Sequence, residues 1–342
     1  MAPATNLLDD FLRPIRLKKP YALHPISAQW GEQAQLRIAA QFVLFGAVEV
    51  PLFQVDVSLG DAEAGKPIPI VLQTESQRSE CILKIEDGLP GGYRYEHVSG
   101  PTLKFKVNKA DPIDLIEYLR KDPFIVRYVD GSSSYNCYHI PVELDAGDFD
   151  VARLESWEWG VPLNKESMGK AGDRNTIQYR TFEKIRDDYD FIFNDDGSGE
   201  AADLVCFKDV DEKTIRLTLV HCKGAVDGRV SRRIENFYYV CGQAQKSIGA
   251  KHGGMKRLAD NLRRRQETWA REGKTRFLKG DYKTLQFFTE KARRAKLEFE
   301  MILVQPGGSA SDINPDALKL LATTEVYLFK TTNADFRVIL SP

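Results

Sequence analysis

The hydrophobic pattern of the first 145 residues is typical of short β-strands. Runs rich in β-branched and aromatic residues alternate with clusters of Gly, Pro and Asp. This spacing predicts an antiparallel sandwich or barrel. The expected strands lie at 38–50, 52–59, 68–74, 81–85, 103–107 and 124–128. One short helix is expected at 112–121, after the capping candidate Asp111.

After residue 175 the spacing of apolar residues changes from that of strands to that of a helix. Residues 176–189 place apolar side chains at helical spacings of four, three and four, which predicts an amphipathic helix. Three strands are expected next, at 190–194, 203–208 and 214–222, followed by three helices, at 232–248, 255–272 and 281–295. The remaining expected elements are a strand at 298–304, a helix at 315–323, and strands at 325–329 and 336–340. The order α-β-β-β-α, then β-α-β, predicts an α+β or α/β domain behind the β-rich one. We place the boundary in the polar segment 143–175, which gives domains 1–145 and 146–342.

Composition supports an ordinary globular protein with a sizeable core. The 342 residues are 42% hydrophobic and 28% charged, and this length favours two domains. Five cysteines without a CxxC pair indicate unpaired thiols in a reducing, cytoplasmic compartment. The N-terminus carries acidic residues before any apolar run, and no stretch approaches 18 apolar residues. We therefore expect neither a signal peptide nor a membrane span.

Charge is concentrated in one segment. The whole chain has a net charge of −1, but residues 223–296 hold 20 basic and 7 acidic residues. Clustered basic charge is typical of phosphate binding, although a solvated helix face would show the same excess. The residues expected to contact nucleic acid are Arg263, Arg264, Arg265, Arg293, Arg294 and Lys246.

A group of chemically capable residues is expected at one edge of the second domain. Asp203 opens the second strand, and alternation on the third strand places His221 and Lys223 on one face at its C-terminal end. Glu183 lies on the preceding helix and Gln245 on the following one. These five residues, the candidate catalytic set, could converge there.

This arrangement resembles the PD-(D/E)xK nuclease superfamily, whose core is αβββαβ. The resemblance implies a restriction-endonuclease-like domain. In that domain Asp203 is the Asp of the second strand, Lys223 the Lys of the (Asp/Glu)-x-Lys motif on the third strand, and Glu183 the Glu of the helix. His221 stands where the superfamily has Asp or Glu, which lowers the local negative charge by one. That departure leaves two alternatives: an active nuclease, or a catalytically degenerate nucleic-acid-binding or assembly subunit.

Longer strings resemble a narrower group. NDDGSGEAADLVCF (194–207), LVHCKG (219–224) and ILVQPG (302–307) are similar to the C-terminal nuclease-like region of bacterial DEAD/DEAH-box helicase proteins found in antiphage defence loci. The chain has no GxxxxGK[ST] loop of its own. The resemblance implies DNA as substrate and a helicase or other defence protein as partner. If the chain works with a helicase motor, that motor is either a separate chain or a segment missing from this sequence. Whether the chain also forms a homo-oligomer stays open.

A divalent metal ion is expected in the site, because phosphodiester hydrolysis needs a polarised phosphoryl oxygen and an acidified water. Mg²⁺, or Mn²⁺, prefers carboxylate and carbonyl oxygens. The expected ligands are Asp203, Glu183, the carbonyl of Cys222, and Glu200 with its loop neighbours Asp195 and Asp196. Lys223 would screen charge that develops on phosphorus. For His221, a metal-binding or proton-accepting role and a strand-capping role stay equally open.

Overall fold

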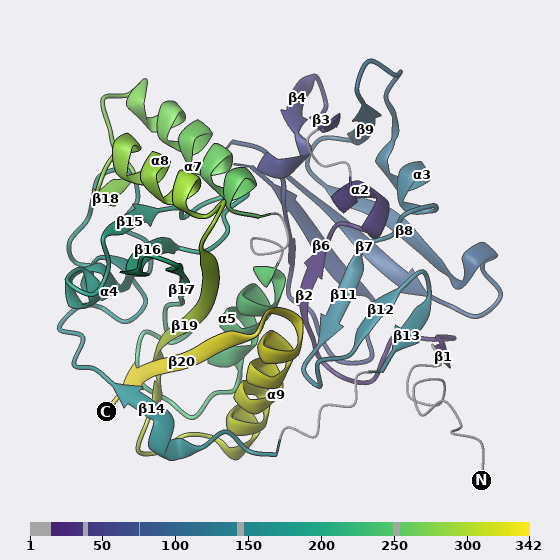
Figure 1. The fold of residues 1–342 in the computed structure, drawn as a ribbon. Helices are drawn as coiled ribbons and strands as arrows, with labels where there is room; N and C mark the ends of the chain where they lie inside the picture. Colours follow the sequence, from purple (N-terminus) through teal and green to yellow (C-terminus); the bar gives the residue numbers. More distant parts are fainter. Residues whose placement is uncertain (1–14, 37–39, 75, 142–146, 249–253) are drawn as a thin grey trace, which may run out of the picture. The chain divides into compact units, whose positions relative to one another are not determined.

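The computed structural model describes residues 15–36, 40–74, 76–141, 147–248 and 254–342 (Figure 1). The chain divides into two compact units, 1–145 with 197–199, and 146–196 with 200–342. The expected domain boundary and the N-terminal segment considered as a signal peptide lie outside the described residues. The mixed α+β fold with its many strands is confirmed. In the described parts of the chain, no helix combines the length and apolarity that crossing a membrane requires.

The first unit is built from antiparallel sheets (Figure 1). One has the order β1 (Ile15–Arg16), β13 (Tyr138–Ile140), β12 (Ser133–Tyr135), β11 (Ile125–Tyr128) and β2 (Pro25–Gln29). The second has the order β10 (Ile113–Asp114), β9 (Leu103–Val107), β3 (Gln41–Phe45) and β4 (Val48–Pro51). The third has the order β5 (Asp56–Leu59), β6 (Ile68–Gln73), β7 (Arg78–Ile85) and β8 (Tyr93–Ser99). Alternate residues of β3, β6, β7, β8 and β9, with residues of β2, β4, β5 and β11, form a common apolar core.

Several local expectations for this unit need correction. The stretch 38–50 contains a hairpin, β3 and β4, because Gly46 turns the chain with φ +60°. Residues Leu52–Gln54 form the 3₁₀ helix η2 and not a strand. The expected helix is the shorter α3 (Leu115–Leu119), and Asp114 caps it in place of Asp111 by accepting from two backbone N–H groups. Six further strands described in this unit are not predicted from the sequence: β1, β2, β8, β10, β12 and β13. The remaining short helices are α2 (Glu32–Leu36), η3 (Pro90–Gly92) and, in the second unit, η4 (Val151–Arg153).

The second unit is organised around one mixed sheet. Its strands follow the order β14 (Leu154–Ser156), β20 (Ala334–Ser341), β19 (Lys296–Ser309), β17 (Thr214–Cys222), β16 (Leu204–Asp211), β15 (Phe191–Asn194) and β18 (Phe277–Lys279). The strands β15, β16 and β17 form an antiparallel meander, whereas β17, β19, β20 and β14 are parallel neighbours. The α-helices bounded within the described residues of this unit are α4 (Ile177–Ile185), α5 (Glu235–Lys246), α7 (Gly254–Ala270), α8 (Tyr282–Lys291) and α9 (Pro315–Thr332).

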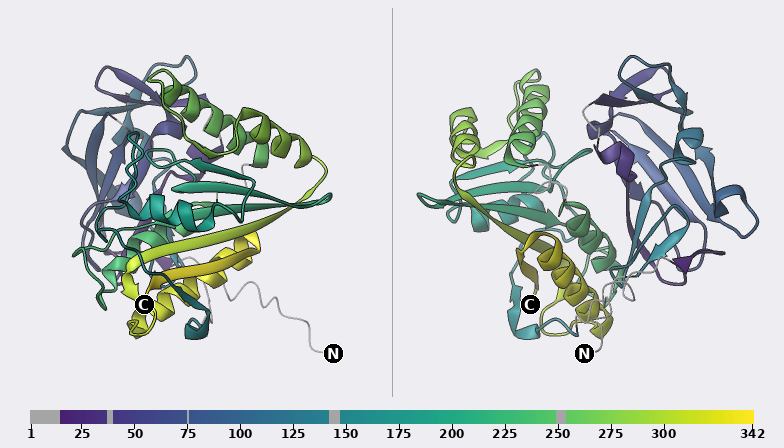
Figure 2. Two further views of the ribbon diagram at one scale, coloured as in Figure 1. Left: turned by 90° about the vertical axis from the view of Figure 1, so that its left-hand side faces the viewer. Right: turned by 45° about the vertical axis from the view of Figure 1, so that its right-hand side comes forward.

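Helices cover both faces of this sheet (Figure 2). Phe207 of β16 pairs with Leu217 of β17, and its ring centroid lies 5.3 Å from that of Phe288 on α8. Alternation places Cys222 on the opposite face from Leu217, and its thiol contacts Thr181 of α4. Thus α4 covers one face, and α8 with its neighbour α7 covers the other at the β15–β16 end. Helices α5 and α9 pack along β19 and β20.

The C-terminal part differs from the expectation. Residues 325–329 do not form a strand, because α9 continues through them for 18 residues and ends where Asn333 adopts φ +51°. Val326, Tyr327 and Phe329 favour a strand, but Leu321, Thr324 and Leu328 are buried at helical spacing. Burial of that helical face outweighs the local preference. The final strand is β20.

Candidate functional site

Three carboxylates gather where β15 passes into β16. Asp196 and Glu200 lie in the connecting loop, and Asp203 lies just before β16. One carboxylate oxygen of each lies within 4.8 Å of the other two. The loop turns through Gly197 and Gly199, whose φ angles of +112° and +78° favour glycine. The sequence placed Asp203 and Glu200 together, with Asp196 as a neighbour, and the structure brings these three together.

Asp203 is the buried member of this group. Its side chain is 2% exposed, and its Oδ2 accepts the backbone N–H of Cys222 at 2.8 Å. Burial raises the pKa of Asp203 well above its usual value, and the neighbouring carboxylates of Glu200, Asp196 and Glu166 raise it further. The Cys222 N–H acts in the opposite direction. A cation at this position would relieve the repulsion among these carboxylates.

The loop that carries the carboxylates is fixed by two arginines. The Nε of Arg265 lies 2.6 Å from Oδ1 of the buried Asp195, and its Nη2 donates to the carbonyls of Asp195 and Asp196. Arg276, 1% exposed, donates to the carbonyls of Asn194 and Asp196 at 3.0 Å. The assignment of Arg265 to nucleic-acid binding therefore needs correction, because its guanidinium is turned into the protein and positions the loop.

Lys223 lies one residue beyond β17 and pairs with a residue from the irregular segment before α4. Its Nζ is 3.1 Å from Oε1 of Glu166, whose Oε2 accepts the backbone N–H of Gly224 at 2.9 Å. Burial alone would lower the pKa of Lys223, but Glu166, Asp203 and Glu200 outweigh it and the pKa is raised. The lysine is therefore held in its charged form beside the carboxylate group.

His221 lies on the same face of the sheet as Asp203. It is 1% exposed, and its Nδ1 is 3.9 Å from Oδ2 of Asp203. Its Nε2 is 2.9 Å from Oγ of Ser247, the residue that follows α5. Burial, helped by the nearby charge of Lys246, lowers the pKa of His221 to about 3. The ring is therefore neutral at physiological pH.

Two other expected site residues, Glu183 and Gln245, are turned elsewhere, whereas Cys222, expected to offer its carbonyl, contacts Asp203 through its N–H. Glu183 pairs with Arg180 on the exposed side of α4, at 2.9 Å, and is not among the clustered carboxylates of the described residues. Gln245 is buried against α9, where its amide donates to Thr324 at 3.1 Å. Cys222 contacts Asp203 through its backbone N–H, while its thiol faces α4. The expected convergence is corrected at Glu183 and Gln245, because helical periodicity does not specify which neighbour a face packs against.

The remaining basic residues lie on α7, in the turn after α8 and at the end of α5. Arg264, Arg293 and Arg294 are exposed, and Arg263 is half-buried and paired with Asp260 at 3.0 Å. Lys246, at the end of α5, is partly exposed. These side chains keep the accessibility that contacts with phosphates would require.

Glu166, Asp196 and Arg276 are the residues that sequence reasoning missed or ranked too low. Glu166 lies in a stretch without hydrophobic periodicity, so no pattern fixes where its side chain points. Arg276 lies within a basic run that suggests a solvated surface. Only the adjacency of Asp195 and Asp196 to a strand end pointed to the loop.

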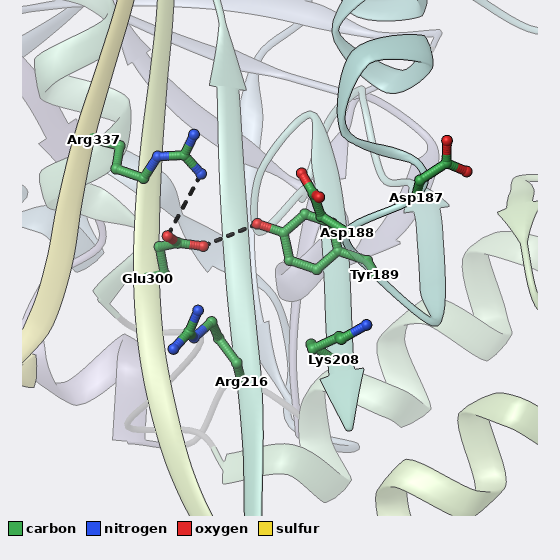
Figure 3. A pocket seen from close by; sticks show the side chains of 7 residues that line it. All are labelled: Asp187, Asp188, Tyr189, Lys208, Arg216, Glu300 and Arg337. Carbon is green, nitrogen blue, oxygen red and sulfur yellow. Dashed lines mark hydrogen bonds and ion pairs between the residues drawn. The ribbon is translucent and has the colours of Figure 1, made fainter. Parts of the chain in front are cut away.

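A separate polar cavity of about 390 Å³ opens beside the same sheet (Figure 3). It is lined by Asp187, Asp188, Tyr189, Lys208, Arg216, Glu300 and Arg337. Glu300 accepts from the hydroxyl of Tyr189 at 2.9 Å and from Thr218 at 2.7 Å. Arg216 is seven residues from Lys223 along β17, which corresponds to roughly 20 Å at the rise of a strand. The cavity is therefore not part of the carboxylate site.

Comparisons with protein-family models, curated proteins and solved structures found no match. The chemistry of the site is therefore argued from its own residues. The clustered carboxylate oxygens of Asp196, Glu200 and Asp203 are the donor type that hard divalent cations prefer. The unpartnered Nδ1 of His221 adds a nitrogen donor beside Asp203. This donor set fits a divalent metal ion.

Proposed function

We propose that the second unit is a metal-dependent nuclease that hydrolyses phosphodiester bonds in DNA. The observation that carries the proposal is the buried carboxylate of Asp203 beside the charged ammonium of Lys223, at neighbouring strand ends. The elements α4, β15, β16, β17, α5 and β19 support it, because they follow the αβββαβ order of PD-(D/E)xK nucleases once α7, β18 and α8, inserted between α5 and β19, are set aside.

Asp196, Glu200 and Asp203 would hold the metal ion, Mg²⁺ or Mn²⁺. When bound, the ion polarises a phosphoryl oxygen and acidifies the attacking water. The burial of Asp203 keeps competing water away from one side of the group and strengthens its interaction with a cation. The backbone N–H of Cys222 and the arginine contacts to the loop fix these carboxylates before substrate binds.

Lys223 would place its ammonium against a non-bridging oxygen of the scissile phosphate. Negative charge grows on that oxygen in the transition state, so a fixed positive charge there lowers the barrier. Glu166 keeps the lysine protonated and restricts its position through Oε1, while its Oε2 holds the following backbone N–H. Glu166 is thus a positioning residue in this scheme.

DNA would approach along the exposed basic side chains of Arg264, Arg293 and Arg294. The β-rich first unit holds its own core, and we propose that it binds a partner or positions the nuclease. A separate helicase of a defence system is the proposed partner, on the resemblance of the sequence alone. Co-purification of the full chain with such a helicase tests this part, and failure to co-purify removes the helicase from the proposal.

The experiment that tests the nuclease proposal compares three proteins on plasmid and linear DNA with Mg²⁺ or Mn²⁺. Wild type should nick or degrade DNA, Asp203→Asn should not, and Asp335→Asn should behave as wild type, because Asp335 is an exposed carboxylate on β20. If wild type binds DNA but does not cleave it, the nuclease proposal is wrong and the chain is a catalytically degenerate DNA-binding subunit.

A further inference from the structure

Ser247 fixes the tautomer of His221. The hydroxyl of Ser247 donates its one proton to the carbonyl of Gln243 at 2.8 Å, one helical turn earlier. The same oxygen lies 2.9 Å from Nε2 of His221, so in that contact it must accept. Nε2 therefore carries the ring proton. An imidazole that is 1% exposed and has no anion or acceptor bonded at Nδ1 within the described part of the chain carries only this one ring proton, so Nδ1 holds a lone pair.

That lone pair faces a second acceptor. Nδ1 of His221 has no hydrogen-bond partner among the described residues, and it lies 3.9 Å from Oδ2 of Asp203. The side chains of both residues are only 2% exposed. Oδ2 of Asp203 accepts the backbone N–H of Cys222, whereas the buried Nδ1 of His221 has no donor among the residues that the structure describes, and an unsatisfied buried acceptor is costly. The arrangement is satisfied when a cation lies between the carboxylate oxygen and the imidazole nitrogen.

We infer that Oδ2 of Asp203 and Nδ1 of His221 together bind a first-row transition-metal ion such as Mn²⁺ or Co²⁺ in preference to Mg²⁺. The inference rests on the proposed function, since it specifies the metal of the same site. Imidazole nitrogen is a good donor for first-row transition ions, whereas Mg²⁺ selects oxygen donors. The His that departs from the Asp or Glu of PD-(D/E)xK nucleases thus changes which metal the site selects.

The surroundings of His221 match those of a metal-binding histidine. Such a ligand commonly donates its other ring N–H to a fixed oxygen, which sets its tautomer and orientation. Ser247 provides that oxygen, and its own contact with Gln243 fixes the hydroxyl in turn. Asp196 and Glu200 complete an oxygen-rich group with Asp203. Ser247 is therefore a positioning residue for the nitrogen donor.

The test measures metal binding by the full chain, without any substrate. Affinities for Mn²⁺ and Mg²⁺ are measured by calorimetry for wild type, His221→Phe, Ser247→Ala and the control His97→Phe, in which the exposed His97 of the first unit is replaced. Pulsed electron paramagnetic resonance on bound Mn²⁺ detects coupling to an imidazole nitrogen. We expect this coupling in wild type and His97→Phe and its loss in His221→Phe. Mn²⁺ affinity should fall at least about tenfold in His221→Phe and by about tenfold in Ser247→Ala, while Mg²⁺ affinity changes less than about threefold.

Different failures have different meanings. If wild type binds both ions but shows no nitrogen coupling, and His221→Phe keeps the same metal preference, the inference is wrong while the carboxylate metal site and the proposed nuclease stand. If wild type binds neither ion, the proposed function fails together with the inference. Should His221→Phe not fold, Ser247→Ala decides: unchanged Mn²⁺ affinity and coupling in that variant would overturn the assigned role of Ser247, and absent coupling in wild type would overturn that of His221.

Discussion

The ammonium of Lys223 lies 3.0 Å from the carboxylate of Glu166, although 57 residues separate the two along the chain. The pair connects the end of β17 to the irregular segment before α4. It holds a positive charge beside the buried carboxylate of Asp203, whose own pKa is raised. This relationship determines what substitutions at either partner should do.

Replacement of Lys223 by Met should reduce DNA cleavage by about 10² to 10³-fold, the usual loss when one preorganised donor at a developing oxyanion is removed. Affinity for DNA should change little, because Lys223 is one of 20 basic residues in the segment 223–296. Single-turnover cleavage and filter binding measure the two quantities. The exposed Lys213→Met is the matched control. Wild-type rates in folded Lys223→Met would exclude the assigned role.

Glu166→Gln should have a smaller effect of the same kind. The amide keeps the shape of the side chain but no longer stabilises the charge on Lys223. We expect cleavage to fall about tenfold at neutral pH, with the double variant Glu166→Gln, Lys223→Met no slower than Lys223→Met alone. Fully additive losses in this double-mutant cycle would show that the two residues act independently.

Replacing two neighbouring arginines of α7 by Ala should affect different properties of the protein: DNA binding for Arg264 and stability for Arg265. Arg264 is exposed, so Arg264→Ala should lower the slope of log affinity against log salt by about 0.9 and leave thermal stability unchanged. Arg265 pairs with the fully buried Asp195, so Arg265→Ala should cost about 3 kcal/mol of unfolding free energy and weaken Mn²⁺ binding. Salt titration of DNA binding and thermal denaturation measure both. If Arg265→Ala lowers the slope of log DNA affinity against log salt but leaves the free energy of unfolding unchanged, Arg265 contacts DNA after all.

The two exposed arginines after α8 provide a second test of the DNA path. Arg293→Ala with Arg294→Ala should reduce the salt slope by about 1.8 in total, from about 0.9 for each phosphate contact released. Binding should depend little on DNA sequence, because phosphate contacts carry no base information. An unchanged slope in this double variant would remove the turn after α8 from the DNA path.

His139 should make the first unit sensitive to acid. Burial lowers the pKa of this histidine below its usual value, against a smaller opposite effect of Asp130. Below about pH 6.5 the unfolded chain therefore binds a proton more readily than the folded one, and stability falls as pH falls through this range. His139→Phe keeps the ring stacked on Tyr21 and should flatten the decrease in melting temperature between pH 7 and 5, whereas exposed His97→Phe should not. The same acid dependence in His139→Phe and wild type would contradict this prediction.

The sequence predicted the part of the site that strands carry. Asp203, His221 and Lys223 follow from alternation on a local antiparallel pair, since β16 and β17 are joined by a short turn. Glu166 and Asp196 lie in segments without a repeating pattern, so only tertiary structure brings their side chains to the site. Arg265 looked like its exposed neighbours, because a basic run does not reveal which member faces a buried carboxylate.

The fold shows the same division. The antiparallel meander and the helix before it follow from hydrophobic periodicity, and the structure adds Thr176 as the N-cap of that helix. The strand expected at 325–329 fails because burial of one face extends α9 through residues that favour a strand. The helical residues Glu183 and Gln245 were placed on their helices correctly, but their partners, Arg180 and Thr324, depend on packing that the periodicity does not encode.

The most direct test of the nuclease account is the single-turnover rate at which excess protein cleaves a 5′-labelled DNA in the presence of Mn²⁺, for wild type and Asp203→Asn. Both proteins must have the circular dichroism spectrum of the folded chain. The account predicts cleavage by wild type and a rate at least about 10²-fold lower for Asp203→Asn, because the amide cannot replace the buried anionic ligand. Equal rates for the two proteins, or no cleavage by a wild type that binds Mn²⁺, would contradict it.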